Sequence, residues 1–361
     1  PSVCCGGDAL NVAIGLAKLG NSVSIAGRVA KDAYSTKNVN IFFSFYLFYS
    51  ILFFFPKENH IKCHFFSLSI AFFHIISDKP SVCCGGDALN VAIGLAKLGN
   101  SVSIAGRVAK DANGEFILRE CDSWGINTSG VIYEKECATA ASYALIDEKG
   151  ERHFLSEKSI FARLSGRDIG DQLIEEADMI YIGSAMAMRK MDEGGIKDVF
   201  CRAHRHGKMT VMDAAFNLED PERDWLSYLA PAFMETDIFF PSMDEAVKIT
   251  GRTEPELIAE CFQRFPMKVF GIKMGAEGCF VTDFKEKRFI KCPQGLPVVD
   301  TTGAGDSFMA GLMSGLANGM DIFSGAEFAS CVASKNVGSV GGTAGIPDYE
   351  EAFDLYQSFY K

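Results

Sequence analysis

The sequence predicts an α/β protein with a mostly parallel sheet, helices on both faces and a small antiparallel flap. Beyond residue 80, short apolar runs alternate with segments of helical pattern, which is typical of βαβ units. Residues 131–156 differ, because two strand-like runs there are joined by DEKG, a hairpin turn signal. With 361 residues, of which 48% are hydrophobic, the chain can bury a large core.

The elements are expected in a regular order after residue 112. NGEFILRECDSWGINTSGV, from Asn113, has the apolar spacing of an amphipathic helix and then begins a strand. Further strands are predicted at MIYIG (179–183), KMTVMD (208–213), TDIFF (236–240), MKVFGIK (267–273) and GCFVTD (278–283). Helix-length segments are EGGIKDVFCRAHRHG (193–207), SMDEAVKITG (242–251) and MAGLMSGLANGM (309–320).

Charge and cysteine usage limit the function. The formal net charge is −11, and residues 1–79 carry seven Lys/Arg against four Asp/Glu, so the remainder carries −14. This acidic body argues against binding to nucleic acid or an anionic membrane, which needs a basic face. The twelve cysteines form no CxxC pair and no cluster with zinc spacing, so we interpret them as reduced thiols of a cytoplasmic protein.

An identical segment of 33 residues, PSVCCGGDALNVAIGLAKLGNSVSIAGRVAKDA, occupies 1–33 and again 80–112. Between the copies lie two apolar runs, 41–55 and 65–76, that hold all eleven phenylalanines of the insert. Each run is shorter than the roughly 20 residues of a transmembrane helix. We interpret residues 1–79 as a duplicated fragment with an insert of the kind that a retained intron or an assembly fault produces, and residues 80–361 as the folded domain. The alternative for the insert is a short membrane hairpin. Only the second copy continues into a helix.

The most informative motif is DTTGAGDSF, Asp300 to Phe308. Gly303 and Gly305 allow a tight turn before a helix start, where converging N–H groups bind anions. Asp306 adds a carboxylate there, and the combination suits phosphoryl transfer, because the dipoles hold phosphate while the carboxylate deprotonates the attacking hydroxyl. The alternative is that Asp306 is an ordinary acidic residue of a first helical turn.

Two signatures carry a family resemblance. DTTGAGDSFMAG resembles the C-terminal signature of the ribokinase-like (PfkB) carbohydrate kinases, and GGDALNVAIGLAKLG followed by GRVAKDANGEF resembles their N-terminal signature. The resemblance covers essentially residues 81–361. It implies a doubly wound α/β domain with a small β lid, placed within about 131–156, and an ATP-dependent kinase acting on a primary hydroxyl of a small sugar such as ribose, fructose or a 2-keto-3-deoxygluconate-like sugar.

The resemblance also implies roles for individual residues. Asp306 would be the catalytic base, with the backbone of Gly303, Ala304 and Gly305 as the anion hole. The remaining implied contacts are sugar binding by Gly85, Gly86, Asp87 and Asn90; ATP binding by Lys273, Gly275, Gly278 and, in the loop GSVGGTAGIP, Gly342; Mg²⁺ placement by Glu245; and a monovalent cation, K⁺, held by Asp300 and Thr302.

Two departures from the family pattern stand out. Ser242 occupies the position of the family's Asn in Asn-x-x-Glu, four residues that end here at Glu245. The family also begins with a strand that precedes the Gly-Gly signature and carries a substrate-binding Asp. The chain opens on Pro1 and the insert ahead of Pro80 resembles no such strand, so we expect an N-terminal piece to be missing.

Other assignments stay open at this point. A nucleoside such as adenosine is the alternative substrate, and a catalytically impaired relic is the alternative of a different class. His204 and His206, near a helix end, are interpreted as solvated residues, and Asp213, after a strand, as a candidate that could face the phosphates. The expected partners are the sugar and ATP, without nucleic acid or membrane, and a homodimer is left open.

Overall fold

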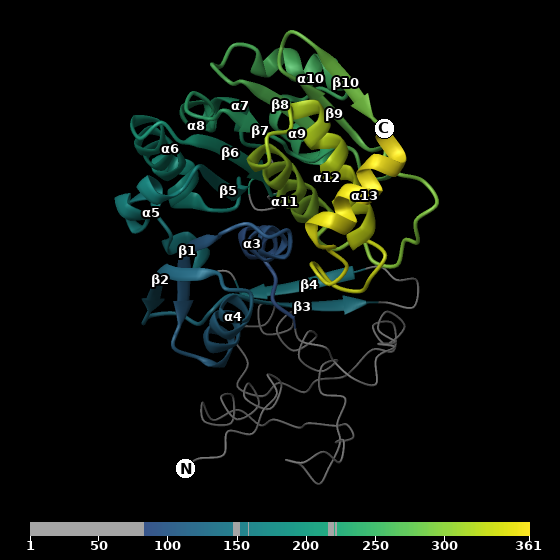
Figure 1. Cartoon of the computed structure of the whole chain (residues 1–361). Coiled ribbons are helices and arrows are strands. Elements are labelled where there is room, and N and C mark those ends of the chain that lie inside the picture. The colour runs from purple at the N-terminus through teal and green to yellow at the C-terminus, as the bar shows by residue number, and fades with distance from the viewer. Residues whose placement is uncertain (1–82, 147–151, 158, 216–219, 221) are drawn as a thin grey trace, which may run out of the picture. The chain divides into compact units, whose positions relative to one another are not determined.

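The computed structural model describes residues 83–361 apart from 147–151, 158, 216–219 and 221 (Figure 1). The predicted fragment and insert at 1–79, and the DEKG turn, lie outside these residues. The helices are α3 (Asp87–Lys97), α4 (Ala112–Ser123), α5 (Asp171–Glu176), α6 (Ile196–Arg205), α7 (Trp225–Tyr228), α8 (Ala230–Phe233), α9 (Met243–Thr250), α10 (Pro255–Phe262), α11 (Ala304–Ala317), α12 (Ile322–Asn336) and α13 (Tyr349–Tyr360). Short helical turns are η2 (Phe161–Arg163), η3 (Gly166–Asp168), η4 (Met191–Gly195) and η5 (Gly275–Glu277).

The main sheet has six strands in the order β10-β9-β8-β7-β6-β5. Its strands are β5 (Met179–Ala185), β6 (Met209–Ala214), β7 (Ile238–Phe239), β8 (Val269–Lys273), β9 (Cys279–Thr282) and β10 (Lys287–Ile290). β5 to β8 are parallel, which confirms the predicted mostly parallel sheet, whereas β9 and β10 are antiparallel additions. The short turn between β8 and β9 leaves no room for a crossover helix, so these two strands pair antiparallel.

Successive residues of the main sheet pack on opposite faces, as expected of a sheet covered on both sides. On β6, Val211 packs in one core with α11, α12 and α13, whereas Met212 packs in the other with α6, α8 and α10. In the second core Phe262 stacks on Phe270 with ring centroids 4.4 Å apart. Figure 1 shows these two groups of helices on either side of the strands.

Two further sheets have two strands each. β1 (Ser103–Ala109) and β2 (Asn127–Glu134) are parallel and are not joined to the six-stranded sheet. β3 (Ala141–Ile146) and β4 (Arg152–Glu157) pair with each other, where the sequence predicts the flap. Residues 131–134 complete β2 rather than the flap. The assignment of the β3–β4 ribbon as a lid stays a prediction.

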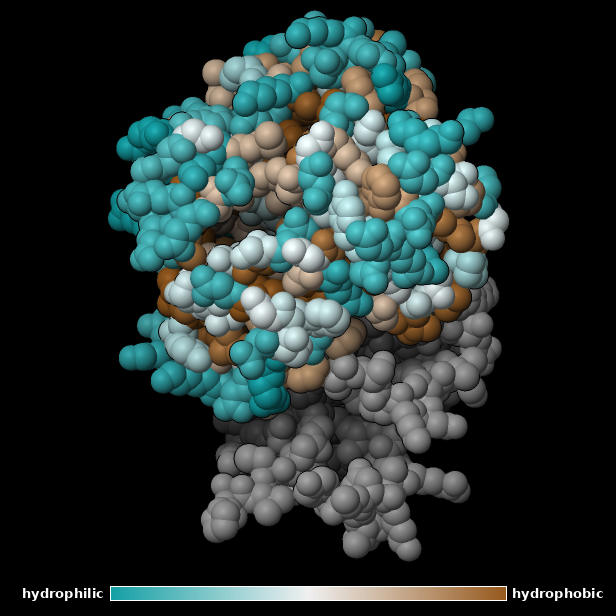
Figure 2. All heavy atoms as spheres, viewed as in Figure 1, coloured by the Kyte–Doolittle hydropathy of each residue, from teal (hydrophilic) through white to brown (hydrophobic). Residues whose placement is uncertain are grey.

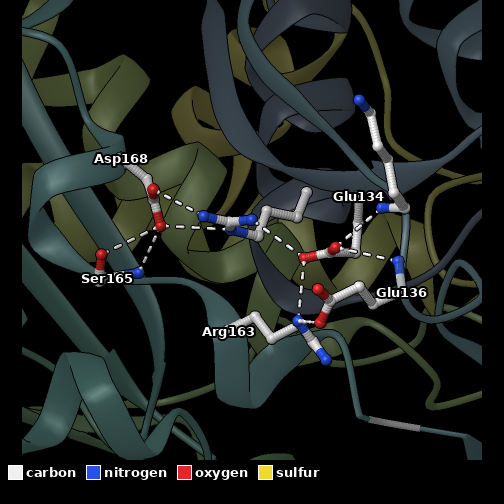
Figure 3. Close-up of polar contacts among 7 residues, drawn as sticks. Glu134, Glu136, Arg163, Ser165 and Asp168 are labelled. Carbon is white, nitrogen blue, oxygen red and sulfur yellow. Dashed lines mark hydrogen bonds and ion pairs between the residues drawn. The ribbon is translucent and has the colours of Figure 1, made fainter.

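A charged network fixes the end of the β1–β2 sheet to the segment that follows β4 (Figure 3). Arg107 of β1 bonds the Asp168 carboxylate at 2.8 and 3.2 Å and that of Glu134 at 3.0 Å. Glu134 also accepts the backbone N–H of Lys135, and Arg163 pairs with Glu136 at 2.7 Å. Because both Arg107 and Glu134 are largely buried and have several partners, they hold these segments in one geometry.

Hydrophilic side chains dominate the face seen in Figure 2, and apolar ones form smaller areas between them. In the part of the chain that the structure describes, no helix combines the length and the apolar character needed to cross a membrane. The two apolar runs of the insert lie outside that part.

Candidate active site

The DTTGAGDSF motif forms the start of α11. Gly303 is its N-cap with φ of 70°, a conformation that glycine adopts without strain, and no side chain of the described residues caps this end. A Cβ on Gly303 would lie 2.1 Å from the carbonyl oxygen of Gly342, so only glycine fits this close approach. The N–H of Ala304 turns back to Thr301 O at 3.3 Å, which leaves those of Gly305 and Asp306 better placed for an anion than that of Ala304.

Asn90 and Asp306 meet across 216 residues of sequence. The Asn90 amide donates to a carboxylate oxygen of Asp306 at 2.7 Å, and Asn90 is 6% exposed. The contact depends on the crossing of α3 with α11, where a Cβ on Gly94 would lie 2.7 Å from that of Ala310. The two helices can therefore approach closely enough for one signature to touch the other.

The surroundings of Asp306 change the pKa of its carboxyl group. Burial, together with the charge of Asp87, raises its pKa to about 6, against the opposing effects of Asn90 and Lys273. Asp87, in the first turn of α3, accepts a hydrogen bond from the hydroxyl of Ser184 at the end of β5. Asp306 therefore stays a carboxylate at neutral pH while being a stronger base than an exposed aspartate.

Lys273 and Asp213 form a buried ion pair at the carboxyl ends of β8 and β6. Burial raises the pKa of Asp213 to about 7, while the Lys273 ammonium opposes this. Burial lowers the pKa of Lys273, but the charges of Asp213 and Glu245 outweigh it and the net pKa lies above its usual value. A Cβ on Gly305 would lie 3.3 Å from Lys273 Nζ, so the ammonium lies beside the anion hole.

Glu245 belongs to a capping box at the start of α9. Its carboxylate accepts the Ser242 N–H at 2.7 Å, and the Ser242 hydroxyl accepts the Glu245 N–H at 3.4 Å. Ser242 also pairs with Lys273 in an isolated parallel bridge, which brings this helix start to the ion pair. Ser242 thus has a capping role that Asn would also fill, and Glu245 adds negative charge near Asp306.

The loop GSVGGTAGIP is held by hydrogen bonds to Asn336 of α12 and to Asp300. Asn336, fully buried on α12, donates to Gly342 O at 2.9 Å and accepts from Gly345 N at 3.0 Å. Asp300 accepts the N–H groups of Thr302 and Gly341 at 2.8 and 3.0 Å. The predicted cation residues and the predicted adenine loop are therefore brought together.

The remaining predicted positions lie at two turns. Gly85 and Gly86 are exposed just before α3, and Gly86 has a φ of 101°. Gly275 and Gly278 form the β8–β9 turn directly after Lys273, and a Cβ on Gly278 would lie 1.9 Å from Ile290 O. The structure places these glycines but shows no contact that would assign them to a sugar or a nucleotide.

Sequence reasoning missed Ser184, Tyr181 and Asn336, which carry no motif. It named Asp213 as a candidate only from its place after a strand. The Tyr181 hydroxyl is buried, has no partner among the described residues, and has a raised pKa because of burial and the charges of Asp213 and Asp306. His204, by contrast, lies between the carboxylates of Glu235 and Asp237 at 3.2 Å each, away from this cluster.

Comparison with known proteins agrees with this geometry. The sequence model of the pfkB family carbohydrate kinases matches residues 77–349. Curated relatives include the 5-dehydro-2-deoxygluconokinase of Geobacillus kaustophilus, 27% identical over 71% of this chain and 79% of its own length, and the ribokinase of Bacillus subtilis, 28% identical over 75% and 87%. A solved structure, described as a putative ribokinase II from E. coli in complex with ATP and Mg²⁺, is similar in fold, with a TM-score of 0.69 at 20% identity over 79% of this chain and 94% of that one.

The chain belongs to the pfkB family of carbohydrate kinases. It is an ATP-dependent phosphotransferase that acts on a sugar hydroxyl, built on the ribokinase-like α/β fold. The identities do not select one sugar.

Proposed function

We propose that this kinase transfers the γ-phosphate of ATP to a primary hydroxyl of a small sugar, with Asp306 as the base. The observation that carries the proposal is the Asn90–Asp306 hydrogen bond, because it joins the implied sugar-binding signature to the implied catalytic turn. Asn90 holds the Asp306 carboxylate in place. Asp87, which lies near Asp306, is positioned to accept a hydrogen bond from a sugar hydroxyl.

The anion-binding side is supplied by the start of α11 and by Lys273. The first-turn N–H groups of α11, with its dipole, stabilise the charge of the transferring phosphate, and the nearby ammonium adds to this effect. Because Asp213 pairs with Lys273, it fixes the direction of the ammonium. The γ-phosphate would then lie at the start of α11, and the sugar hydroxyl would lie between this phosphate and the Asp306 carboxylate.

We further propose Mg²⁺ near Glu245 and K⁺ at the Asp300 loop. Magnesium takes one or two carboxylates and keeps several waters, which suits the single carboxylate of Glu245 beside bound phosphates; the bound metal would supply charge neutralisation. No group of three or more His, Cys, Asp or Glu among the described residues is arranged to hold a metal ion, so ATP would have to complete the shell. Asp300 already accepts hydrogen bonds from two N–H groups. It would therefore fix the backbone of the loop that binds K⁺, rather than surround the ion itself.

The base assignment is tested with Asp306→Asn, which keeps size but cannot accept the hydroxyl proton. Turnover should fall by roughly 10²-fold or more while ATP affinity changes little. Asp348→Asn makes the same change at the start of α13, where Asp348 caps the helix, and should leave turnover unchanged. Near-normal turnover of Asp306→Asn with every accepted substrate would show that the 303–306 turn is only a helix start.

The acceptor is identified by turnover measured with ribose, fructose, 2-keto-3-deoxygluconate, 5-dehydro-2-deoxygluconate and adenosine at equal concentrations. Ribose or 5-dehydro-2-deoxygluconate is the expected best acceptor, because the two relatives compared above are named as kinases of those sugars. Preference for adenosine would make the chain a nucleoside kinase, and no turnover with any acceptor would favour the impaired relic. A cytoplasmic location stays a prediction from cysteine spacing.

A further inference from the structure

The turn after β5 holds two residues in the left-handed region. Ser184 has a φ of 58° and Met186 a φ of 78°, and only one other non-glycine described residue, Phe284, has a positive φ. Such conformations cost free energy and persist only where neighbouring groups impose them. The turn lies at the carboxyl end of β5, and Ser184 donates its hydroxyl hydrogen to Asp87.

A buried carboxylate imposes this turn. Asp192, 6% exposed, accepts the N–H of Met186 at 3.0 Å on one oxygen and the N–H of Met188 at 3.2 Å on the other. Its own N–H returns to Met188 O at 2.8 Å, and Ala187 N bonds Ser184 O at 3.0 Å. The charged acceptor therefore closes the turn from within, where water does not compete.

We propose that Asp192 is a positioning residue for sugar binding: it clamps the 184–188 turn so that Ser184 fixes the rotamer of Asp87. The proposal rests on the proposed function, in which Asp87 contacts the sugar. Asp192 itself touches neither the sugar nor the phosphate. Its loss should weaken sugar binding more than it slows the chemical step, because Asp306 bonds Asn90 and Lys273 bonds Asp213 rather than the turn, and Asp87 keeps its charge near Asp306.

The clamp should also respond to pH. Burial raises the pKa of Asp192 to about 7; the two N–H groups and Arg223 oppose this, and Glu193 adds to it. Tyr228, whose own pKa responds to Asp192 and Arg223, is a further ionisable group near it, and Arg189 acts on both Tyr228 and Arg223. Because only the carboxylate accepts both N–H groups, the clamp is lost as pH falls through about 7, and KM for the sugar should rise.

The test compares Asp192→Asn, Ser184→Ala and the double variant in full-length enzyme. We expect Asp192→Asn to raise the sugar KM about 5- to 10-fold, with kcat changed less than about 3-fold, since uniform binding rather than transition-state stabilisation is lost. In the Asp192→Asn variant, the backbone amides of peptides covering 184–188 should exchange their hydrogens faster than in the wild-type enzyme. The double variant should match Ser184→Ala, because both changes act on one contact.

The control is Asp198→Asn on α6, where an exposed carboxylate pairs with Arg202 at 3.1 Å and lies outside the turn. It should alter neither KM nor exchange at 184–188. Additive effects in the double variant, or an unchanged KM and exchange in Asp192→Asn, would overturn the proposal. If Asp192→Asn does not fold, a wild-type sugar KM that is flat between pH 6 and 8 would overturn it instead. Hydrogen exchange at 184–188 is measured without substrate. Its result therefore does not depend on whether Asp306 is the catalytic base.

Discussion

At the residue scale, the behaviour of Asp306 follows from its neighbours. Burial and the Asp87 carboxylate both disfavour its charged form, and its pKa rises to about 6 from the ordinary 3.8. The fold therefore favours the protonated form, so the contribution of this carboxyl to stability is present below pH 3.8 and is lost as pH rises through about 6. Catalysis requires the opposite, ionised form, so stability and activity have opposite pH dependences at this group.

We predict that kcat/KM rises with pH through about 6, the pKa of the base in the free enzyme. Asp87→Asn removes the neighbouring charge and should shift this acid limb to lower pH, even as the rate falls through weaker sugar binding. The measurement is the pH profile of kcat/KM for both proteins. Asp283→Asn, a change at a half-buried residue between β9 and β10, should leave the midpoint in place, and an unmoved midpoint in Asp87→Asn would contradict the assigned cause.

Tyr181 supplies a second residue-scale prediction. Tyr181→Phe removes only a buried hydroxyl that has no partner among the described residues, so the free energy of unfolding of substrate-free protein should change by less than about 1 kcal/mol. If the hydroxyl hydrogen-bonds to bound substrate or to the carboxylates around it, kcat/KM should fall by about 10-fold. Denaturant unfolding and steady-state kinetics together check this, and unchanged kinetics would leave Tyr181 with a packing role alone.

At the scale of elements, the site depends on how closely α3 packs on α11. Gly94 lies at this crossing, where an added Cβ would be 2.7 Å from Ala310 Cβ and 3.1 Å from Ile346 Cδ1. Any side chain here must push α3 away, and Asn90 lies one helical turn before Gly94 on α3. The geometry of the base therefore depends on a glycine that contacts no reacting group.

Gly94→Val should destabilise the protein by about 1–3 kcal/mol through overpacking. It should also lower kcat, because Asn90 would be displaced from Asp306. Gly170→Val is the matched control, since an added Cβ there meets nothing within 4 Å and its φ is −70°. Thermal unfolding and turnover are measured for both; loss of stability with a normal kcat would show that the Asn90 contact does not orient the base.

At the scale of the whole molecule, the two copies of the 33-residue segment differ in what they contribute to the family match. The family match spans residues 77–349, and α3, which supplies Asn90, is formed by the second copy. The contacts of Asp306 described above are all with residues after 83. The described contacts of Asp306 therefore involve α3 of the second copy.

We therefore predict that deleting residues 1–79 leaves soluble yield and turnover unchanged or improves them, since the insert adds long apolar runs that favour aggregation. Expression of both lengths, followed by size-exclusion chromatography and kinase assay, checks this. A control deletion that also removes Pro80 to Asn90 should abolish turnover. Loss of solubility or activity on removal of 1–79 alone would mean that the duplicate fills a structural place.

Much of the fold could be predicted because its signals are local. Strand runs such as 179–183 and 208–213 lie within a residue or two of β5 and β6, and the glycine turn at Gly303 begins α11 as its spacing predicts. β7 is shorter than the predicted 236–240, although the N–H groups of Asp237 and Phe240 still bond Thr210 O and Met212 O of β6 at 3.1 Å each, just outside the two residues assigned to the strand. Apolar period and turn chemistry involve only near neighbours, so sequence suffices for them.

The sequence by itself determined the α/β class, the family and the helix start that carries Asp306, because each is written in contiguous residues. Only the tertiary structure decided that Asn90 bonds Asp306, that Lys273 pairs with Asp213, and that Asp192 closes a turn beneath Ser184. These contacts join segments that meet only when helices pack on a sheet. Burial then changes their chemistry, since the pKa of a carboxyl group depends on surroundings that the order of residues does not show.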